Sequence, residues 1–388
     1  MAEYLVLGAG MQGTACVFDL IERGGAKAVT WVDANDARLE AGLRRIRELS
    51  NFSELRGRQL DASDTRGLSP LFSEADVCVN ALPYRFAPAM TMLALEARTH
   101  YLDLGGNTAI VLEQLGMHRE HPNAAQLCVL PDCGLMPGMG NLFVAHAVAE
   151  LGDLARCEVR CGGLPTNPKP PLGYKLVFSV AGLTNEYFGR AHLLRGGKVT
   201  EVETFGELER IDVGNLGELE AFLTSGGLGT TPWTFEGRID ELDYKTVRYP
   251  GHHAQFKTLL DLGLLSEDPI EVDKAHVVPR HLLHRLMEKQ LDFPEDRDLV
   301  FLRMTAWPKA GGAPLIMELF DRPEEEPGGF TAMERTTAFS ATAVAAMVAA
   351  GEVEPGPSPI ERSVPTQTYL AALEARGLRV SLERGSSA

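Results

Sequence analysis

The chain has 388 residues, of which 45% are hydrophobic and 23% charged, and its formal net charge is −16. The length favours two domains, and the composition is typical of a globular protein with a sizeable core. The negative charge argues against nucleic acid or an anionic membrane as a partner, because both bind basic surfaces.

The N-terminus passes directly from Met1 into an apolar run, so we expect no signal peptide, and no run of roughly 18 apolar residues predicts a membrane span. The cysteines form no C-x-x-C pair, and most lie in apolar runs. This pattern predicts buried, reduced thiols in a cytoplasmic protein and argues against a structural zinc site. The six cysteines are Cys16, Cys78, Cys128, Cys133, Cys157 and Cys161.

A nucleotide-binding motif opens the first third of the chain. An apolar strand at residues 4–7 is followed by a G-x-G-x-x-G pattern and by an amphipathic helix that continues to Arg23. In this context the first glycine permits a tight turn, the second lets the backbone approach a pyrophosphate, and the third lets helix and strand pack closely. The free N–H groups at the helix N-terminus favour phosphate binding. We therefore expect the cofactor to contact Gly8, Gly10, Met11, Gln12 and Gly13.

A second strand at residues 28–32 ends in Asp33, where an acid that binds the ribose hydroxyls is expected. Its carboxylate would repel a 2′-phosphate, and Ala34 and Asn35 bring no arginine beside it, which favours NAD over NADP. A Rossmann-like fold with a degenerate site is the alternative. Asp61 ends a third strand at 58–61 and either reaches the adenine edge or belongs to a cap of the helix at 65–73.

Strands and helices continue to alternate up to residue 130, with helices at 36–49 and 86–98 and strands at 76–81, 100–104 and 126–130. This order predicts a parallel, doubly wound sheet, and therefore an NAD-binding Rossmann domain over residues 1–130. Asn80, Ala81 and Leu82 follow the fourth strand at the carboxyl edge, where the nicotinamide half of the cofactor is expected.

Beyond a Gly/Pro-rich hinge at 131–141 the pattern changes. Residues 131–330 predict an α+β domain with an open, largely antiparallel sheet and helices on one face, used for substrate binding and dimerisation. Strands are expected at 155–163, 174–179, 198–204, 243–249, 298–306 and 314–321, and helices at 141–151, 180–190, 251–265 and 279–291. After a turn at 322–329, an Ala-rich helix at 331–350 and a short helix at 366–376 are expected to pack on the Rossmann sheet, so that 331–388 completes the first domain.

Several strings together resemble the saccharopine-dehydrogenase-like family, and within it the enzymes that act on the ε-amine of lysine. They span residues 4–375, and those of the second domain discriminate best: Tyr174 with Phe178-Ser179, residues 224–227, residues 244–252 and residues 335–338. In the first domain the matching strings are residues 5–10, 80–84, 103–106 and 131–138. Glutamate-forming saccharopine reductases of the family carry Asp before Pro-Gly in the hinge, where this chain has Met136. That difference favours a single small amino acid as substrate.

The resemblance implies NAD-dependent oxidative deamination of L-lysine to the semialdehyde, which cyclises to piperideine-6-carboxylate. The ε-ammonium, whose pKa is about 10.4, must first lose its proton, which requires a base or a desolvated pocket. The α-carboxylate requires a cationic anchor, for which we expect Arg248, with a structural ion pair as the alternative. Thr224 and Ser225 either add hydroxyl and backbone donors or form a plain turn.

The resemblance also implies substrate contacts from Tyr84, Tyr174 and Cys133, and we expect the cysteine to act through packing or its backbone, not as a nucleophile. Asp103 ends the fifth strand and either holds or deprotonates the amine or caps the loop at 105–107. His252 is a candidate base because the pKa of histidine lies near neutral pH, although a structural role is the alternative.

Two other functions remain open. One is a saccharopine or carboxynorspermidine-type enzyme that couples an amine with a carbonyl. The other is a non-catalytic NAD sensor, because the fold alone does not establish activity. In each case we expect a homo-oligomer, a dimer or tetramer, with the open sheet as the contact.

Overall fold

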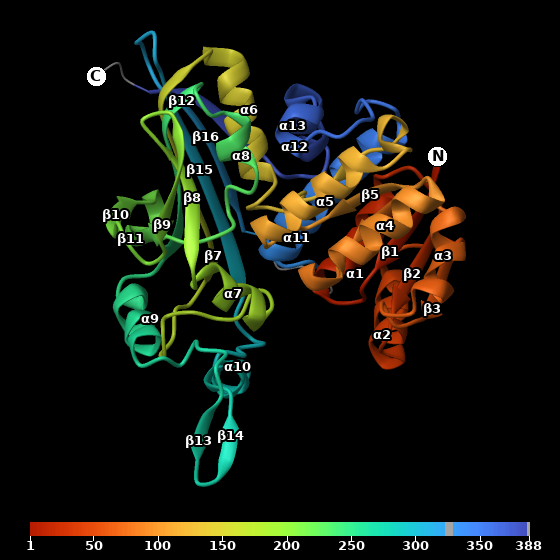
Figure 1. The fold of residues 1–388 in the computed structure, drawn as a ribbon, viewed down its shortest axis with the longest axis horizontal. Coiled ribbons are helices and arrows are strands. Elements are labelled where there is room, and N and C mark those ends of the chain that lie inside the picture. The colour runs from red at the N-terminus through yellow and green to blue at the C-terminus, as the bar shows by residue number, and fades with distance from the viewer. Residues whose placement is uncertain (323–328, 386–388) are drawn as a thin grey trace.

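The computed structural model describes residues 1–322 and 329–385, and it has two parts, each built on its own sheet (Figure 1). The expected turn at 322–329 and the last three residues of the expected 331–388 segment lie mostly outside the described residues. Within the described residues, no helix is long and apolar enough to cross a membrane.

The first sheet is a six-stranded Rossmann sheet in the order β3-β2-β1-β4-β5-β6, with all neighbours parallel. Its strands are β1 (Ala2–Leu7), β2 (Ala26–Asp33), β3 (Leu55–Gln59), β4 (Val77–Asn80), β5 (His100–Asp103) and β6 (Val129–Leu130). Its helices are α1 (Met11–Glu22), α2 (Asp36–Leu49), α3 (Thr65–Ser73), α4 (Ala87–Ala97) and α5 (Thr108–Glu120), with short 3-10 turns η1 (Tyr84–Phe86) and η2 (Ala124–Gln126). The third strand, expected at 58–61, begins three residues earlier, because the buried Leu55 is the first residue that pairs with β2.

The second sheet has nine strands in the main order β10-β11-β12-β7-β15-β16-β17, with β8 joined to β12 and β9. Only the β12–β7 pair is parallel, so the expectation of a largely antiparallel sheet is confirmed. Its strands are β7 (Leu154–Pro165), β8 (Arg190–Arg195), β9 (Lys198–Glu203), β10 (Glu209–Asp212), β11 (Glu218–Leu223), β12 (Ile239–Arg248), β15 (Asp298–Pro308), β16 (Leu315–Asp321) and β17 (Val380–Arg384).

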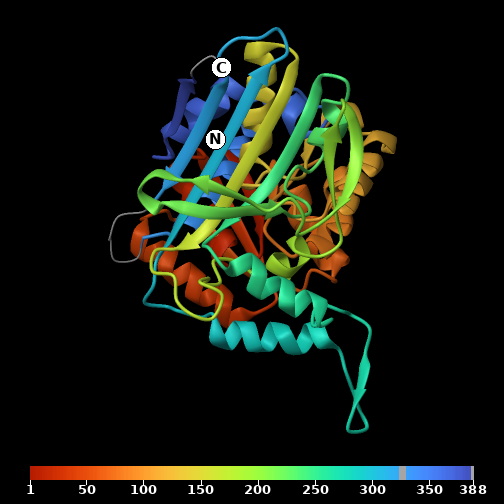
Figure 2. The same ribbon diagram turned by 90° about the vertical axis from the view of Figure 1, so that its left-hand side faces the viewer.

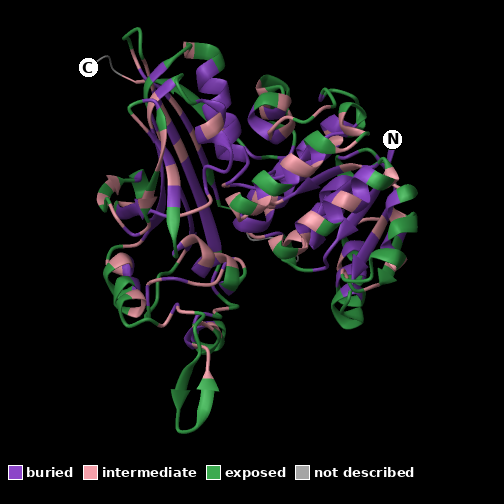
Figure 3. Ribbon diagram, in the orientation of Figure 1, coloured by how far each residue is buried: buried purple, intermediate pink, exposed green. Residues whose placement is uncertain are grey.

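The helices of this part are α6 (Met139–Leu151), α7 (Val180–Glu186), α8 (Thr231–Thr234), α9 (His252–Asp261) and α10 (Pro279–Gln290), with η3 at Gly214–Leu216. A separate hairpin, β13 (Ile270–Val272) and β14 (Ala275–Val277), projects between α9 and α10 (Figure 2). Purple, buried residues dominate the long strands and the helices between the two sheets, which locates the core (Figure 3).

The expected strand at 174–179 is absent from the structure. This segment is held by the loop that follows α10 instead of by the sheet: Lys175 donates from Nζ to the carbonyl oxygen of Phe293 at 2.8 Å, and the Leu176 N–H donates to that of Leu291 at 3.1 Å. The alternating apolar residues of segment 174–179 therefore pack against a loop and do not pair with a strand.

The Ala-rich helix is confirmed as α11 (Ala332–Ala349), and it packs on α1 and against β4 and β5. Its small side chains permit this close approach. The end of the chain departs from the expectation, however. After α12 (Ile360–Ser363) and α13 (Thr366–Glu374), β17 pairs with β16 and returns to the second sheet. The segment after residue 331 thus belongs to both parts.

Candidate active site

The turn after β1 has the geometry that a dinucleotide requires. Gly8 has a φ of 98°, and a Cβ on Gly13 would lie 1.8 Å from the Gly8 carbonyl oxygen, so both positions require glycine. Nothing lies within 4 Å of a Cβ built on Gly10, and no side chain caps the N-terminus of α1. Free N–H groups therefore face open space, where a pyrophosphate fits. Met11, at 47% exposed, borders this space, whereas Gln12 donates from Nε2 to the Met333 carbonyl oxygen at 3.2 Å.

Asp33 ends β2 beside this turn and is buried. Its Oδ2 accepts a hydrogen bond from the Ala9 N–H and its Oδ1 accepts one from the Asn35 N–H, each at 2.7 Å. Arg38 places Nη1 3.9 Å from Asp33 Oδ2, so a guanidinium that follows five residues later does approach the ribose-binding position. Because Arg38 lies within α2 and not directly after Asp33, the residues adjacent to Asp33 gave no sign of this cation.

Asp61 lies exposed after β3, and its Oδ1 accepts hydrogen bonds from the N–H and hydroxyl of Ser63 at 2.8 and 2.6 Å. Asp64 caps α3 by accepting from the Gly67 N–H. The structure therefore gives Asp61 a role in the turn that precedes the helix, which favours the capping alternative over contact with adenine.

At the ends of β4 and β5, the polar side chains satisfy one another. Asn80 donates from Nδ2 to the Tyr101 hydroxyl at 2.8 Å and accepts from the Leu82 N–H at 3.0 Å, which shapes the turn through Ala81. Asp103 is 4% exposed, and its Oδ2 accepts from the Tyr101 hydroxyl and from Gln114 Nε2. Its Oδ1 accepts from the backbone N–H groups of Gly105 and Asp132.

Burial raises the pKa of Asp103, and these four hydrogen bonds oppose the rise. Each of the two carboxylate oxygens of Asp103 thus accepts two hydrogen bonds from the protein itself. The expectation that Asp103 deprotonates the amine is therefore weakened, and the alternative, a cap for the following loop, describes the geometry.

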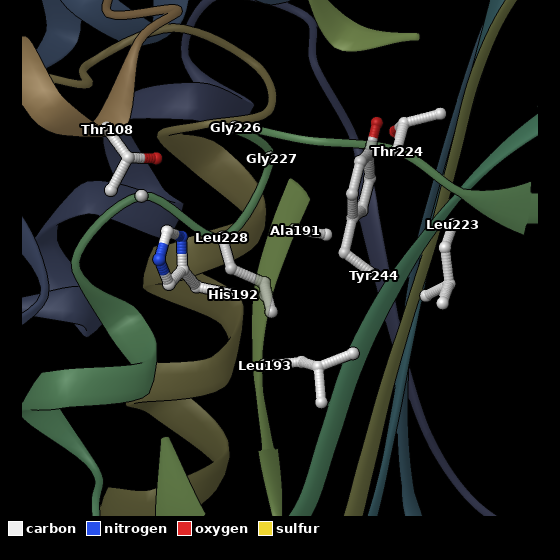
Figure 4. A pocket seen from close by; sticks show the side chains of 11 residues that line it. Thr108, Ala191, His192, Leu193, Leu223, Thr224, Gly226, Gly227, Leu228 and Tyr244 are labelled. Atoms are coloured by element: carbon white, nitrogen blue, oxygen red, sulfur yellow. The ribbon is translucent and has the colours of Figure 1, made fainter. Parts of the chain in front are cut away.

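The two parts of the molecule meet at this edge. Tyr84 directs its hydroxyl to Asn185 Oδ1 at 3.5 Å, and Asn185 donates from Nδ2 to the Gly106 carbonyl oxygen at 2.8 Å. Beside this bridge lies a small hollow, lined by Thr108 of the first part and by His192, Thr224, Tyr244 and the loop 226–229 of the second (Figure 4). Tyr84 thus lies at the junction of the two parts, and its contact with substrate, which the resemblance implies, stays a prediction.

The hydroxyls of Thr224 and Ser225 are occupied within the second part. Thr224 shares a 2.7 Å hydrogen bond with Thr246, and Ser225 donates to the Asn185 carbonyl oxygen at 2.9 Å. The Ser225 N–H also donates to the Glu186 carbonyl oxygen at 2.8 Å. Ser225 thus holds the end of α7 and Thr224 is tied to β12, so the structure favours positioning roles over direct substrate contact.

Arg248 ends β12 on the inner face of the second sheet and is 3% exposed. Its Nε donates to the Tyr187 hydroxyl at 2.7 Å and its Nη1 to the Val247 carbonyl oxygen at 2.9 Å, while the ring of Tyr174 lies 4.9 Å from the guanidinium carbon. Among the described residues, no carboxylate lies within 4.0 Å of it. The other buried cations, Arg160, Lys245 and Arg376, each have one.

His252 lies near this arginine, to which Tyr187 links it, and its surroundings differ from those expected of a catalytic base. Its Nε2 hydrogen-bonds the Tyr187 hydroxyl at 3.1 Å and its Nδ1 the Leu172 carbonyl oxygen at 3.0 Å, and the side chain is 1% exposed. Burial, followed by the charge of Arg248, lowers the pKa of His252 to about 3. A buried imidazole with both nitrogens engaged agrees with the structural alternative for His252 more than with a base. It orients Tyr187, which in turn orients Arg248.

Glu186, which the sequence analysis missed, ends α7 near Arg248. Its carboxylate has no hydrogen-bond partner among the described residues, and burial raises its pKa to about 7 against the opposing charge of Arg248. The hydroxyl of Tyr174, 1% exposed, is also without a partner there. Arg248, Glu186 and the Tyr174 hydroxyl thus lie beside the inner face of the second sheet, and each can still form a hydrogen bond to a ligand.

Cys133 is fully buried in the hinge, where its Sγ contacts the Leu130 carbonyl oxygen at 3.2 Å and burial raises the pKa of its thiol. This agrees with a packing role and no nucleophile. All six cysteines are buried and unpaired.

The neighbouring Asp132 adopts a left-handed φ of 64°, and neither carboxylate oxygen has a hydrogen-bond partner in the described part of the chain. Cβ atoms on Gly105 and Gly229 would come within 1.9 and 2.2 Å of these oxygens. This explains the glycine in each flanking loop, since the Asp132 carboxyl is wedged between the two parts. Burial, followed by the charges of Asp103 and Glu361, raises the pKa of Asp132 well above its usual range.

Comparisons with known proteins agree with this geometry. A model of the saccharopine dehydrogenase NADP-binding domain matches residues 4–129, and a model of the saccharopine dehydrogenase C-terminal domain matches residues 134–378. Similar curated proteins include the saccharopine dehydrogenases (NADP(+), L-glutamate-forming) of Pyricularia oryzae, 25% identical over 68% of this chain and 58% of the relative, and of Saccharomyces cerevisiae, 24% identical over 61% and 54%.

The chain thus spans about half the length of the curated relatives it matches. Among solved structures, apo saccharopine dehydrogenase (L-Glu forming) from Saccharomyces cerevisiae covers all of both chains with a TM-score of 0.75 at 17% identity, which shows a shared fold. The matched ranges meet between residues 129 and 134, at the hinge that the sequence predicted.

Proposed function

Because the chain belongs to the saccharopine dehydrogenase family, we propose that it is a nicotinamide-dependent dehydrogenase that oxidises a carbon–nitrogen bond of an amino acid. One observation carries this proposal: Arg248 is a buried guanidinium with no carboxylate within salt-bridge distance among the described residues. Burying a cation without a counter-ion is costly, so such a group is expected to receive an anionic ligand.

The substrate's α-carboxylate is the ligand that fits. Tyr187, itself held by His252, fixes the Nε of Arg248, and the Val247 carbonyl oxygen fixes its Nη1. The Nη2 has no partner among the described residues and can donate to a carboxylate oxygen. The network therefore orients the guanidinium before substrate arrives, which reduces the entropy lost on binding.

Glu186 and Tyr174 supply what the rest of an amino-acid head group needs. An ammonium group next to a bound carboxylate would find the Glu186 carboxylate, and the unpaired Tyr174 hydroxyl would donate to a carboxylate oxygen. The reacting amine must be uncharged, because only a free lone pair can assist departure of a hydride. Activity should accordingly rise at alkaline pH.

The cofactor's contribution is to accept that hydride, and the turn at Gly8–Gly13 with Asp33 fits its pyrophosphate and ribose. We propose NAD as the cofactor. The buried Asp33 carboxylate supports it, because this charge would repel a 2′-phosphate. The approach of Arg38 and the NADP named for the relatives support NADP, so the preference needs measurement.

Two substrates fit the proposed chemistry. The names of the relatives support saccharopine, and the proposal of a saccharopine-type reaction is the better supported of the two on that ground. The number of available cations supports L-lysine. Saccharopine carries three carboxylates, whereas Arg248 is the one buried cation described above that has no carboxylate within 4.0 Å.

The test is reduction of NAD or NADP by the purified protein, followed by absorbance, with saccharopine and L-lysine in separate arms at alkaline pH. Turnover with saccharopine alone would establish the saccharopine reaction, and turnover with lysine alone would establish deamination of its ε-amine. No turnover with either amino acid and either cofactor, in protein that binds NAD in a direct titration, would contradict the proposed activity and favour a sensor.

A further inference from the structure

A hairpin arm, residues 270–277, projects from the second part away from the rest of the molecule (Figures 1 and 2). Its two three-residue strands join through Asp273 and Lys274, both with positive φ, as a two-residue turn requires. All of it except Val277 is exposed, and it appears green along its length in Figure 3. A two-stranded hairpin alone in water is marginally stable, so a projecting one needs a surface to cover it.

One face of the hairpin arm is apolar. Residues that pair across an antiparallel ladder share a face, and Ile270 pairs with Val277 while Val272 pairs with Ala275. Ile270 is 52% exposed and Val272 46%, so this face is open to solvent. The opposite face holds the Glu271–His276 pair. The arm is therefore an amphipathic ribbon whose apolar side is about half open to solvent at Ile270 and Val272.

A matching stripe lies on α10, directly after the arm. Leu283 and Met287 pack into the core, whereas Leu282 and Leu286 are 49% and 50% exposed. Four helical residues span about 6 Å and two strand residues span about 6.6 Å, so the two leucines have nearly the spacing of Ile270 and Val272.

The charges beside these two stripes are complementary. Arg285 and Lys289 are exposed in the row next to the leucines, and Arg285, whose side chain is 84% exposed, also pairs with Glu288 at 3.0 Å. The apolar face of the arm lies between acidic residues, Asp268 before β13 and Asp273 at the turn, which are both exposed. An arm with two acidic residues, Glu271 and Asp273, against one lysine, Lys274, in a chain with a net charge of −16 is unsuited to an anionic membrane.

We propose that the hairpin arm docks on α10 of a second copy of this chain, with the partner's arm on α10 of the first. Each chain supplies both complementary surfaces, so one two-fold axis generates two identical contacts and closes the dimer. His284 of α10 hydrogen-bonds Thr184 of α7 at 2.8 Å, so the contact would also support the helix that carries Glu186.

Sedimentation velocity of the full chain at micromolar concentration tests this contact. We expect wild type to sediment as a pair of 42.2 kDa chains, and the double variant Ile270→Glu with Val272→Glu to dissociate at concentrations on the order of 100-fold higher, because loss of buried anchors dominates interface affinity. The matched control changes the other face, Glu271→Gln with His276→Gln, and should leave dissociation unchanged. A monomeric wild type, or a dimer that the apolar-face variant does not weaken, would overturn the proposal.

Cross-linking gives a second readout that does not depend on affinity. The native cysteines are all buried, so thiols introduced by Val272→Cys with Leu286→Cys would be the accessible ones. Mild oxidation should give a covalent dimer on a non-reducing gel, and Glu271→Cys with Leu286→Cys should give far less. Equal yields from the two pairs, or no covalent dimer from the first, would show that the arm does not lie on the partner's α10.

Discussion

Two buried charged residues, Asp103 at the end of β5 and Arg248 at the end of β12, differ in how fully their own chain satisfies them. On the Rossmann side, Asp103 accepts four hydrogen bonds from its own chain. On the side of the second sheet, Arg248 lies at least 4.0 Å from every described carboxylate, and the Tyr174 hydroxyl has no described partner. A satisfied buried group contributes to the fold, whereas an unsatisfied one costs stability and is retained where a ligand completes it. We therefore take Arg248 and Tyr174, and not Asp103, as the groups that the proposed substrate contacts.

Removing the open cation should produce the largest effect. Arg248→Ala should lower kcat/KM for the amino acid about 100- to 1000-fold, about 3–4 kcal/mol, because a buried carboxylate would lose its charged partner. Steady-state kinetics against substrate concentration measures this loss, which should appear mainly in KM. Arg248→Lys keeps the charge but not the geometry of two parallel hydrogen bonds, so its kcat/KM should lie between those of wild type and Arg248→Ala. Wild-type KM in the alanine variant would remove Arg248 from the site.

The satisfied carboxylate should behave differently. Asp103→Asn replaces one acceptor oxygen by a donor and leaves two of the four donors unmatched, so we expect a loss of about 2 kcal/mol in the free energy of unfolding. Urea denaturation measures this loss, while kcat at saturating substrate in the folded protein should change little. A variant of normal stability whose kcat is abolished would restore Asp103 as a catalytic residue and break the comparison.

The Rossmann half could be predicted because its determinants are local. A strand, the glycines and the following helix lie within residues 2–22, and Asp33 ends the next strand. The long strands of the second part were also predicted, since their apolar runs are long. The short strands β8, β10, β11 and β17 were not predicted, because each has six residues or fewer, too short for a clear alternating pattern, and is fixed by pairing with other strands.

The site itself was predicted only where a motif marked it. Arg248 lies in a recognisable string, but Glu186 lies 62 residues earlier, and only folding brings α7 beside β12. A charged residue at the end of the apolar segment Val180–Glu186 was the available signal. The choice between a base and a structural role for His252 could not be made from sequence, because its neighbours in the chain do not reveal its burial, which lowers its pKa.

Substitution of Glu186 should give the smallest of the three effects. It also tests most directly whether a group that its own chain leaves without a hydrogen-bond partner contacts the substrate. Its pKa, raised from the ordinary 4.5 to about 7, means that the free protein holds a neutral acid below pH 7 and a carboxylate above it. If the carboxylate binds the substrate ammonium, kcat/KM should rise through pH 7, and Glu186→Gln should abolish that rise and lower the plateau about tenfold.

Stability gives Glu186 an independent readout. A carboxyl with a raised folded pKa stabilises the fold fully below pH 4.5, and this contribution is lost as the pH rises through 7. Glu186→Gln should therefore flatten the decline of unfolding free energy over this interval while it removes the kinetic rise. If the decline flattens but the kinetic rise persists, the carboxylate is buried for a reason other than substrate, and an unsatisfied group on the second sheet would no longer be sufficient to identify a substrate contact.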